Sequence, residues 1–212
     1  MTESQSPQSR LPRTSTLLLI AVVLLIGDGV LMVWQPYRKY HRGQRATSVI
    51  ERLGGDVVTE VFPPSWMPDS VDDEYLSVFG RVTQIRLTGA QISPAEFEHL
   101  EGLADLEILS LTNTHVSDAG LVYLRGLSNL RGLSLNGTQV SNVGLESLQG
   151  LANLKTLGLT NTRVSDAGLE HLRGLTHLKN LSLGDTQVTQ AGIEKLRQSL
   201  PDCKIEWTPS SE

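Results

Sequence analysis

Residues 106–129 read LEILSLTNTHVSDAGLVYLRGLSN, and two further copies follow without a gap, LRGLSLNGTQVSNVGLESLQGLAN at 130–153 and LKTLGLTNTRVSDAGLEHLRGLTH at 154–177. The same register extends back to Val82 and forward to Leu178, so five copies start at 24-residue intervals. A fixed period of this length indicates a solenoid, in which one small structural unit is stacked on copies of itself.

Each copy changes its hydrophobic period halfway along. Leu109 and Leu111 alternate with polar residues, which predicts a strand that buries one face. Leu121, Leu124 and Leu127 recur at three-residue spacing, which predicts a short helix with one apolar stripe. Strands one period apart are then expected to run parallel, with right-handed connections.

The first copy shows where the helix begins. It reads Ser93-Pro94-Ala95-Glu96, a capping box with proline at the first helical position. By alignment, N-caps are predicted at Ser117, Ser141, Ser165 and Thr189, and glycines that end the helices at Gly126, Gly150 and Gly174. A column of threonines, which we interpret as hydroxyls satisfying backbone groups in the turn after each strand, comprises Thr114, Thr138, Thr162 and Thr186.

The register also predicts the two ends of the solenoid. Residues 58–81 are interpreted as a degenerate N-terminal capping repeat, in which Pro63 and Pro64 interrupt the strand. The five repeats occupy 82–201. Residues 202–212 then supply a closing strand at Cys203–Trp207 and a tail.

The repeated phrase resembles a leucine-rich repeat, LxxLxLxx(N/T)xL followed by a variable half, over about residues 82 to 207. The resemblance implies an α/β horseshoe with a parallel sheet on its concave face and short helices on its convex face. The D-A-G-L half is similar to that of bacterial membrane-tethered repeat proteins. It is more distantly similar to repeats attached to F-box proteins, but the repeat cysteines and the F-box are missing. A ubiquitin-ligase-like substrate adaptor therefore stays only a second alternative.

An apolar run precedes the repeats. Residues 17–34 read LLLIAVVLLIGDGVLMVW, which is long enough for a single transmembrane anchor behind a disordered tail at 1–16. A cleaved signal peptide with its apolar region at 17–26 is the competing interpretation. Residues 35–57 are expected to form a basic juxtamembrane segment and an amphipathic helix, whose apolar face comprises Ala46, Val49, Ile50 and Leu53.

The side of the membrane stays open at this stage. Four basic residues follow the run and two precede it, which favours a cytoplasmic repeat domain, whereas a signal peptide would place the domain outside. One cysteine excludes an internal disulfide framework and leaves both compartments possible.

Charge separates the chain into two parts. Residues 47–212 carry 21 acidic and 12 basic side chains, a net −9, whereas residues 1–46 carry two acidic and six basic ones, a net +4. A domain this acidic is a poor candidate for binding phosphate backbones, so we expect no nucleic-acid partner.

No catalytic pattern emerges from the sequence. Four of the five histidines occupy three different places in the repeat, and His41 lies before the repeats. The chain has no C-x-x-C, H-E-x-x-H or phosphate-binding loop. We therefore expect a protein without enzymatic activity, metal or cofactor. The repeated Ser-Asp pairs have the positions of helix caps rather than those of a catalytic triad.

The exposed face of the strands and the rim where the strands end are the candidate binding surface. We expect a protein partner there, and the candidate contacts are Arg86, Thr112, Asn113, His115, Asn136, Thr160, Asn161, Arg163 and Asp185. The leading hypothesis is a membrane-tethered protein-binding module. The alternative is a structural or self-associating envelope protein without a dedicated ligand.

Overall fold

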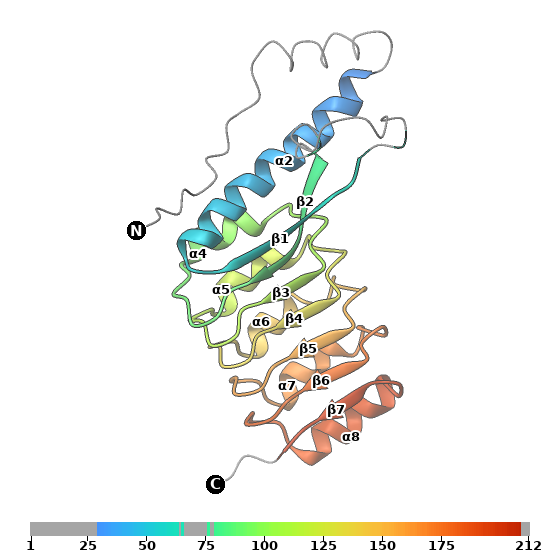
Figure 1. Cartoon of the computed structure of the whole chain (residues 1–212). Helices are drawn as coiled ribbons and strands as arrows, with labels where there is room; N and C mark the ends of the chain where they lie inside the picture. The colour runs from blue at the N-terminus through green and yellow to red at the C-terminus, as the bar shows by residue number, and fades with distance from the viewer. Residues whose placement is uncertain (1–28, 64, 66–75, 77–78, 209–212) are drawn as a thin grey trace, which may run out of the picture.

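A computed structural model of the chain describes residues 29–63, 65, 76 and 79–208. Its centre is a seven-stranded sheet whose strands lie in the order of the sequence, β1 to β7 (Figure 1). The strands are β1 (Asp56–Val61), β2 (Gly80–Arg86), β3 (Ile108–Ser110), β4 (Gly132–Ser134), β5 (Thr156–Gly158), β6 (Asn180–Ser182) and β7 (Lys204–Glu206).

From β2 to β7 each strand is parallel to the next, and the register advances by one repeat at every step. Leu109 pairs with Leu133, Leu133 with Leu157, and Leu157 with Leu181. These leucines are almost completely buried. The predictions of parallel strands and of a closing strand near Cys203–Trp207 are confirmed.

Short helices cover the opposite side of the core (Figure 1). They are α4 (Pro94–Phe97), η2 (Glu98–Leu100), α5 (Asp118–Leu121), η3 (Val122–Leu124), α6 (Asn142–Glu146), α7 (Asp166–Leu169), η4 (Glu170–Leu172) and α8 (Gln190–Ser199). The expected C-terminal glycines Gly126, Gly150 and Gly174 have no positive φ, because the chain leaves each helix through a turn that any residue can adopt.

The threonine column has the predicted structural role. Each hydroxyl is buried and donates to the carbonyl oxygen three residues earlier, as Thr138 does to Leu135 at 2.6 Å and Thr162 to Leu159 at 2.6 Å. These bonds satisfy backbone acceptors in the turn that follows each strand.

The first residue of each inner helix links its repeat to the next. Asp118 accepts hydrogen bonds from the backbone N–H of Ser141 at 2.7 Å and from its hydroxyl at 2.6 Å. Asp166 does the same for Thr189, at 2.8 and 2.6 Å. The carboxylates thus hold the N-cap of the following repeat by charge-assisted hydrogen bonds.

The N-cap prediction holds only in part. Ser141 and Thr189 accept hydrogen bonds from their own helices, from Val143 N–H at 3.3 Å and Gly192 N–H at 3.2 Å. The hydroxyl of Ser165 instead accepts from the side chain of Asn142 at 2.8 Å. Ser117 begins α5 without a side-chain cap bond.

The first repeat has the predicted capping box. The backbone N–H and the hydroxyl of Ser93 both donate to Glu96 Oε2, each at 2.8 Å. The backbone hydrogen bond from Ser93, followed by the hydroxyl bond and the nearby Arg52 guanidinium, lowers the pKa of Glu96.

This lowered pKa predicts a pH-dependent contribution to stability. Because the folded-state pKa lies below the unfolded-state value of about 4.3, the contribution is present above that value and is lost as the pH falls through the folded-state pKa. We expect Glu96→Ala to unfold at lower urea concentration than wild type at pH 7, with the difference shrinking towards pH 3. A difference that stays constant over this range would contradict the assignment.

The N-terminal end differs from the predicted degenerate repeat. Strand β1 runs antiparallel to β2, with Val57 opposite Ile85 and Val61 opposite Gly80. A copy of the repeat would have placed a parallel strand there. Instead the chain turns sharply at Gly54, whose φ is +76°, and enters the sheet in the reverse direction.

A single long helix, α2 (Gly29–Arg52), closes this end of the core. Ala46 and Ile50 are buried there, and Leu53 packs against the same core, as the apolar pattern predicted. Most of the predicted anchor, residues 17–28, lies outside the described residues. None of the helices that the structure describes has the length and apolar character needed to cross a bilayer.

Candidate functional site

Two rows of outward-facing side chains form the exposed side of the sheet, which we call the sheet face. One row runs Val58, Gln84, Ile108, Gly132, Thr156, Asn180 and Lys204, and the other runs Asp56, Arg86, Ser110, Ser134, Gly158, Ser182 and Glu206. The centre of the face is uncharged and made mainly of small residues. Charged side chains stand at its two ends, on β1, β2 and β7.

Three predicted contact residues hold neighbouring repeats together. Thr112 Oγ1 lies 2.9 Å from Ser134 Oγ, one repeat further on. Asn136 Oδ1 accepts from the backbone N–H of Thr160 at 2.9 Å, and the same oxygen lies 2.7 Å from where a Cβ on Gly158 would stand. All three residues are half-buried. The side chains of Thr112 and Asn136 are therefore engaged with the next repeat, whereas Thr160 contributes only its backbone N–H.

Asn113, Asn161 and Asp185 are exposed and share a backbone conformation. Their φ angles are 56°, 55° and 53°, in the left-handed region that asparagine and aspartate tolerate better than most residues. The turn after each strand therefore explains why these residue types occur here. All three residues are exposed at the rim, although the side-chain oxygen of Asn113 lies against Gly137 of the next repeat.

The remaining predicted contacts do not converge on one point. Arg86 is exposed on the sheet face, whereas His115 and Arg163 are exposed where their strands end. His115 and Arg163 are two repeats apart, which at the usual strand spacing is about 10 Å. The predicted residues therefore lie along one edge of the sheet, without forming an enclosed site.

A row of basic residues at the start of the strands was missed from the sequence. Arg131, Lys155 and Lys179 directly precede β4, β5 and β6, and all three are exposed. We call them the basic column. The signal was present as three basic residues 24 positions apart, but the candidate surface was drawn from positions inside and after the strands and not from those before them.

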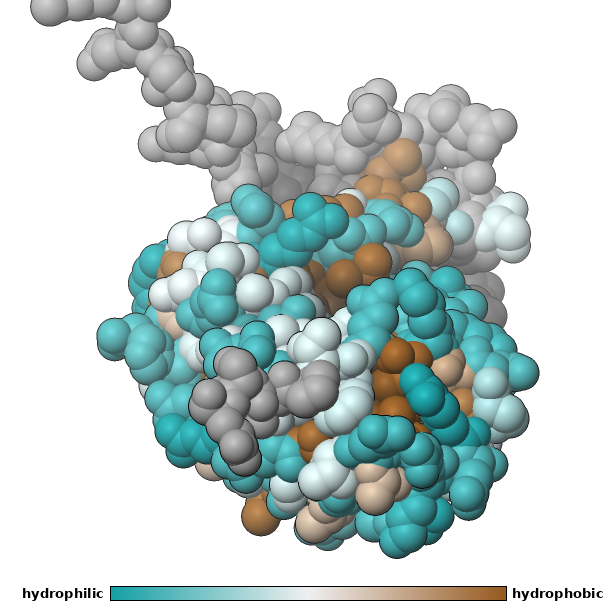
Figure 2. All heavy atoms as spheres, turned by 90° about the horizontal axis from the view of Figure 1, so that it is seen from below, coloured by the Kyte–Doolittle hydropathy of each residue, from teal (hydrophilic) through white to brown (hydrophobic). Residues whose placement is uncertain are grey.

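The C-terminal edge carries a charged pair and the single cysteine. Lys204 Nζ lies 2.7 Å from Glu206 Oε1, and this hydrogen bond raises the pKa of Lys204 and lowers that of Glu206. Burial raises the pKa of the Cys203 thiol, which keeps it protonated and a poor nucleophile. Viewed from this end, the molecule is mostly hydrophilic, with apolar atoms visible in gaps between polar side chains (Figure 2).

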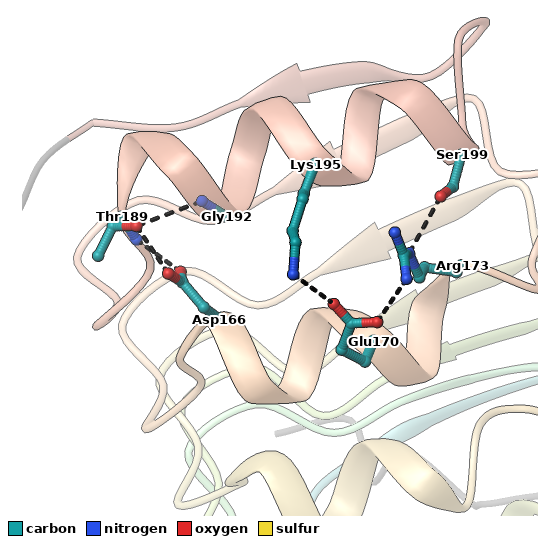
Figure 3. A network of polar contacts seen from close by, with 7 residues as sticks. All are labelled: Asp166, Glu170, Arg173, Thr189, Gly192, Lys195 and Ser199. Carbon is teal, nitrogen blue, oxygen red and sulfur yellow. Dashed lines mark hydrogen bonds and ion pairs between the residues drawn. The ribbon is translucent and has the colours of Figure 1, made fainter.

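A shallow groove of about 380 Å³ separates α7 and η4 from α8. Glu170 bridges it, with Arg173 Nη1 at 2.6 Å and Lys195 Nζ at 3.7 Å, and Arg173 Nε donates to Ser199 Oγ at 3.1 Å (Figure 3). The Glu170 carboxylate therefore forms ion pairs with both Arg173 and Lys195. The network attaches the last helix to the preceding repeat.

No protein-family model and no curated protein sequence matches the chain. Among solved structures, it is similar to a leucine-rich-repeat protein of Leptospira interrogans, at 23% identity over 57% of this chain and 29% of that one (TM-score 0.44). It is also similar to an internalin of Listeria monocytogenes, at 20% identity over 60% of this chain and 39% of that one (TM-score 0.39). The chain thus spans less than half the length of either protein.

A third similarity covers most of both chains. The leucine-rich-repeat ectodomain of a receptor kinase of Arabidopsis thaliana aligns with 79% of this chain and 91% of its own length, at 20% identity and a TM-score of 0.52. This likeness supports the fold described above, a parallel sheet with short helices on its other side. The chain has the leucine-rich-repeat fold.

Proposed function

We propose that the chain is a non-enzymatic protein-binding module that presents its sheet face to a partner. The observation that carries the proposal is the face itself: strands β2–β7 expose two rows of mostly small side chains, while the short helices pack on the opposite side of the core. Small side chains let a partner approach the sheet closely. Hydroxyl and amide groups such as those of Ser182 and Asn180 supply hydrogen bonds at the same surface.

The proposal is tested by filling the sheet face. Ser134 lies in the middle strand, so Ser134→Arg places a long charged side chain where a partner would lie. We expect the variant to lose at least about tenfold in affinity for a protein cross-linked to wild type on membranes, as central interface positions do.

Val122→Arg is the matched control, since Val122 is 47% exposed on the helical side. Equal capture by the two variants, with both folded by circular dichroism, would overturn the proposal. A chain that cross-links only to copies of itself would instead support the self-associating alternative.

We also propose that residues 17–34 anchor the module to a membrane as a single pass. The proposal is supported by α2, whose described part already includes the end of the apolar run from Gly29 to Trp34. The same helix contains the basic residues from Arg38 to Arg45 and ends against the repeat core. Protease treatment of intact cells, read with an antibody to the carboxyl tail, tests the sidedness. Recovery of the full chain in the soluble fraction would contradict the anchor.

A further inference from the structure

The basic column has a regular geometry. The backbone N–H of Lys155 donates to the carbonyl of Arg131 at 2.8 Å, and that of Lys179 donates to the carbonyl of Lys155 at 2.8 Å. The three residues therefore occupy adjacent ranks of the sheet, about 4.8 Å apart along its width. Like charges at this spacing repel one another, so the charges of the basic column do not stabilise the fold.

The column is also unusual within its domain. Residues 47–212 carry 12 basic side chains against 21 acidic ones, and three of the 12 stand in this one column. The residues two positions before Arg131, Lys155 and Lys179 are not acidic. There Asn129, Asn153 and His177 each hydrogen-bond to a backbone carbonyl of the preceding repeat, at 2.8, 2.8 and 3.0 Å.

The carboxylates that do reach the column contact only its ends. Arg131 pairs with Glu107 at 3.2 Å, and Lys179 pairs with Asp202 at 3.4 Å. The side chains of all four residues are more than 40% exposed, and such surface pairs contribute little to stability. Lys155, between them, makes no ion pair with any residue that the structure describes.

We propose that the basic column binds an acidic helical segment of the protein partner. This inference rests on the proposed function and specifies the chemistry of the partner. Carboxylates three or four residues apart on a helix lie about 5–6 Å from one another, close to the spacing of the strands. A helix lying across β4, β5 and β6 therefore places successive carboxylates over Arg131, Lys155 and Lys179.

The same observations disfavour a nucleic acid as the occupant. Binding a phosphate backbone depends on a broad basic surface, whereas this column lies in a domain with a net charge of −9. On the sheet-face side, the column is followed by Gly132, Thr156 and Asn180, which leave room for a helix and provide uncharged polar contacts.

The test uses the full chain in a non-ionic detergent and two labelled alanine-based helical peptides, one with glutamate at every fourth position and one with glutamine. Fluorescence anisotropy is expected to show tighter binding of the glutamate peptide to wild type, weakening with salt. Lys155→Glu should lower that affinity about fivefold to tenfold, because one attraction becomes a repulsion. Arg197→Glu, an equal charge change at an exposed position of α8, should change it less than about twofold.

Three results would overturn the inference: equal binding of the two peptides, equal losses in the two variants, or tighter binding of a single-stranded RNA of similar length. The sheet-face proposal fails separately. If Ser134→Arg abolishes capture of the partner but Lys155→Glu leaves peptide binding unchanged, only the proposal of an acidic helix is wrong. If Lys155→Glu weakens peptide binding but Ser134→Arg leaves capture unchanged, only the sheet-face proposal is wrong.

Discussion

Leu157→Ala is expected to lower the free energy of unfolding by about 2–5 kcal/mol, the usual range for removing a large side chain from a packed core. Leu157 lies in β5, is 0% exposed, and is flanked in register by Leu133 and Leu181. A cavity at this position interrupts the leucine stack that joins the repeats on either side.

Urea denaturation followed by circular dichroism measures this loss. Val122→Ala is the control, since that side chain is 47% exposed and its truncation should cost less than about 0.5 kcal/mol. A loss below about 0.5 kcal/mol for Leu157→Ala would mean that the side chain is not in the core. Separate transitions for the two halves would indicate that the mutation uncouples them.

Gly168→Ala is expected to destabilise the protein by about 1–3 kcal/mol through overpacking. A Cβ at this position would stand 2.5 Å from Asn142 Oδ1 and 3.1 Å from Leu145 Cδ1. The Asn142 oxygen has little freedom to move, because it accepts the backbone N–H of Ser165 at 2.9 Å. The methyl group therefore competes directly with a hydrogen bond between two repeats.

A double-mutant cycle tests this reading. If Asn142 is the obstacle, Asn142→Ala combined with Gly168→Ala should cost less than the sum of the two single changes. Gly126→Ala is the matched control, because no atom lies within 4 Å of its would-be Cβ and its φ is not positive. Additive costs in the cycle, or an equal cost at Gly126, would contradict the assignment.

Most of the fold follows from patterns inside one repeat. The spacing of Leu109 and Leu111 predicts the buried side of each strand, the threonine column predicts the turn, and the fixed period predicts the parallel register. These features depend on neighbours close in sequence, or on the equivalence of successive copies. A single sequence therefore contains them.

The features that could not be predicted depend on contacts between different repeats or on places where the pattern stops. Glycine is needed at Gly144, Gly168 and Gly192 because a side chain 26 residues earlier, Asp118, Asn142 or Asp166 respectively, lies where a Cβ would stand. Strand β1 does not continue the repeat, so no period in the sequence predicts that it runs antiparallel to β2.

The candidate site was predictable only as a surface. Residue type indicated polar contacts at Thr112 and Asn136, but only the structure shows that their side chains are committed to the neighbouring repeats. Conversely, Lys155 was not predicted as a binding residue, because a single exposed lysine indicates no particular function. Its significance comes from Arg131 and Lys179, which the register brings alongside it.

The side-chain bridge from each inner helix to the following N-cap has a direction, and it is not made by the last helix. Asp118, Asn142 and Asp166 each reach forward to the following N-cap, but the equivalent residue in the last helix is Gln190, whose side chain turns back to Glu194 in the same helix at 2.9 Å. At the other end Pro94 occupies this position, and Glu96 stands where later copies need glycine. If a further copy were added by duplication, keeping this bridge would require aspartate or asparagine at residue 190 and a glycine in the added unit.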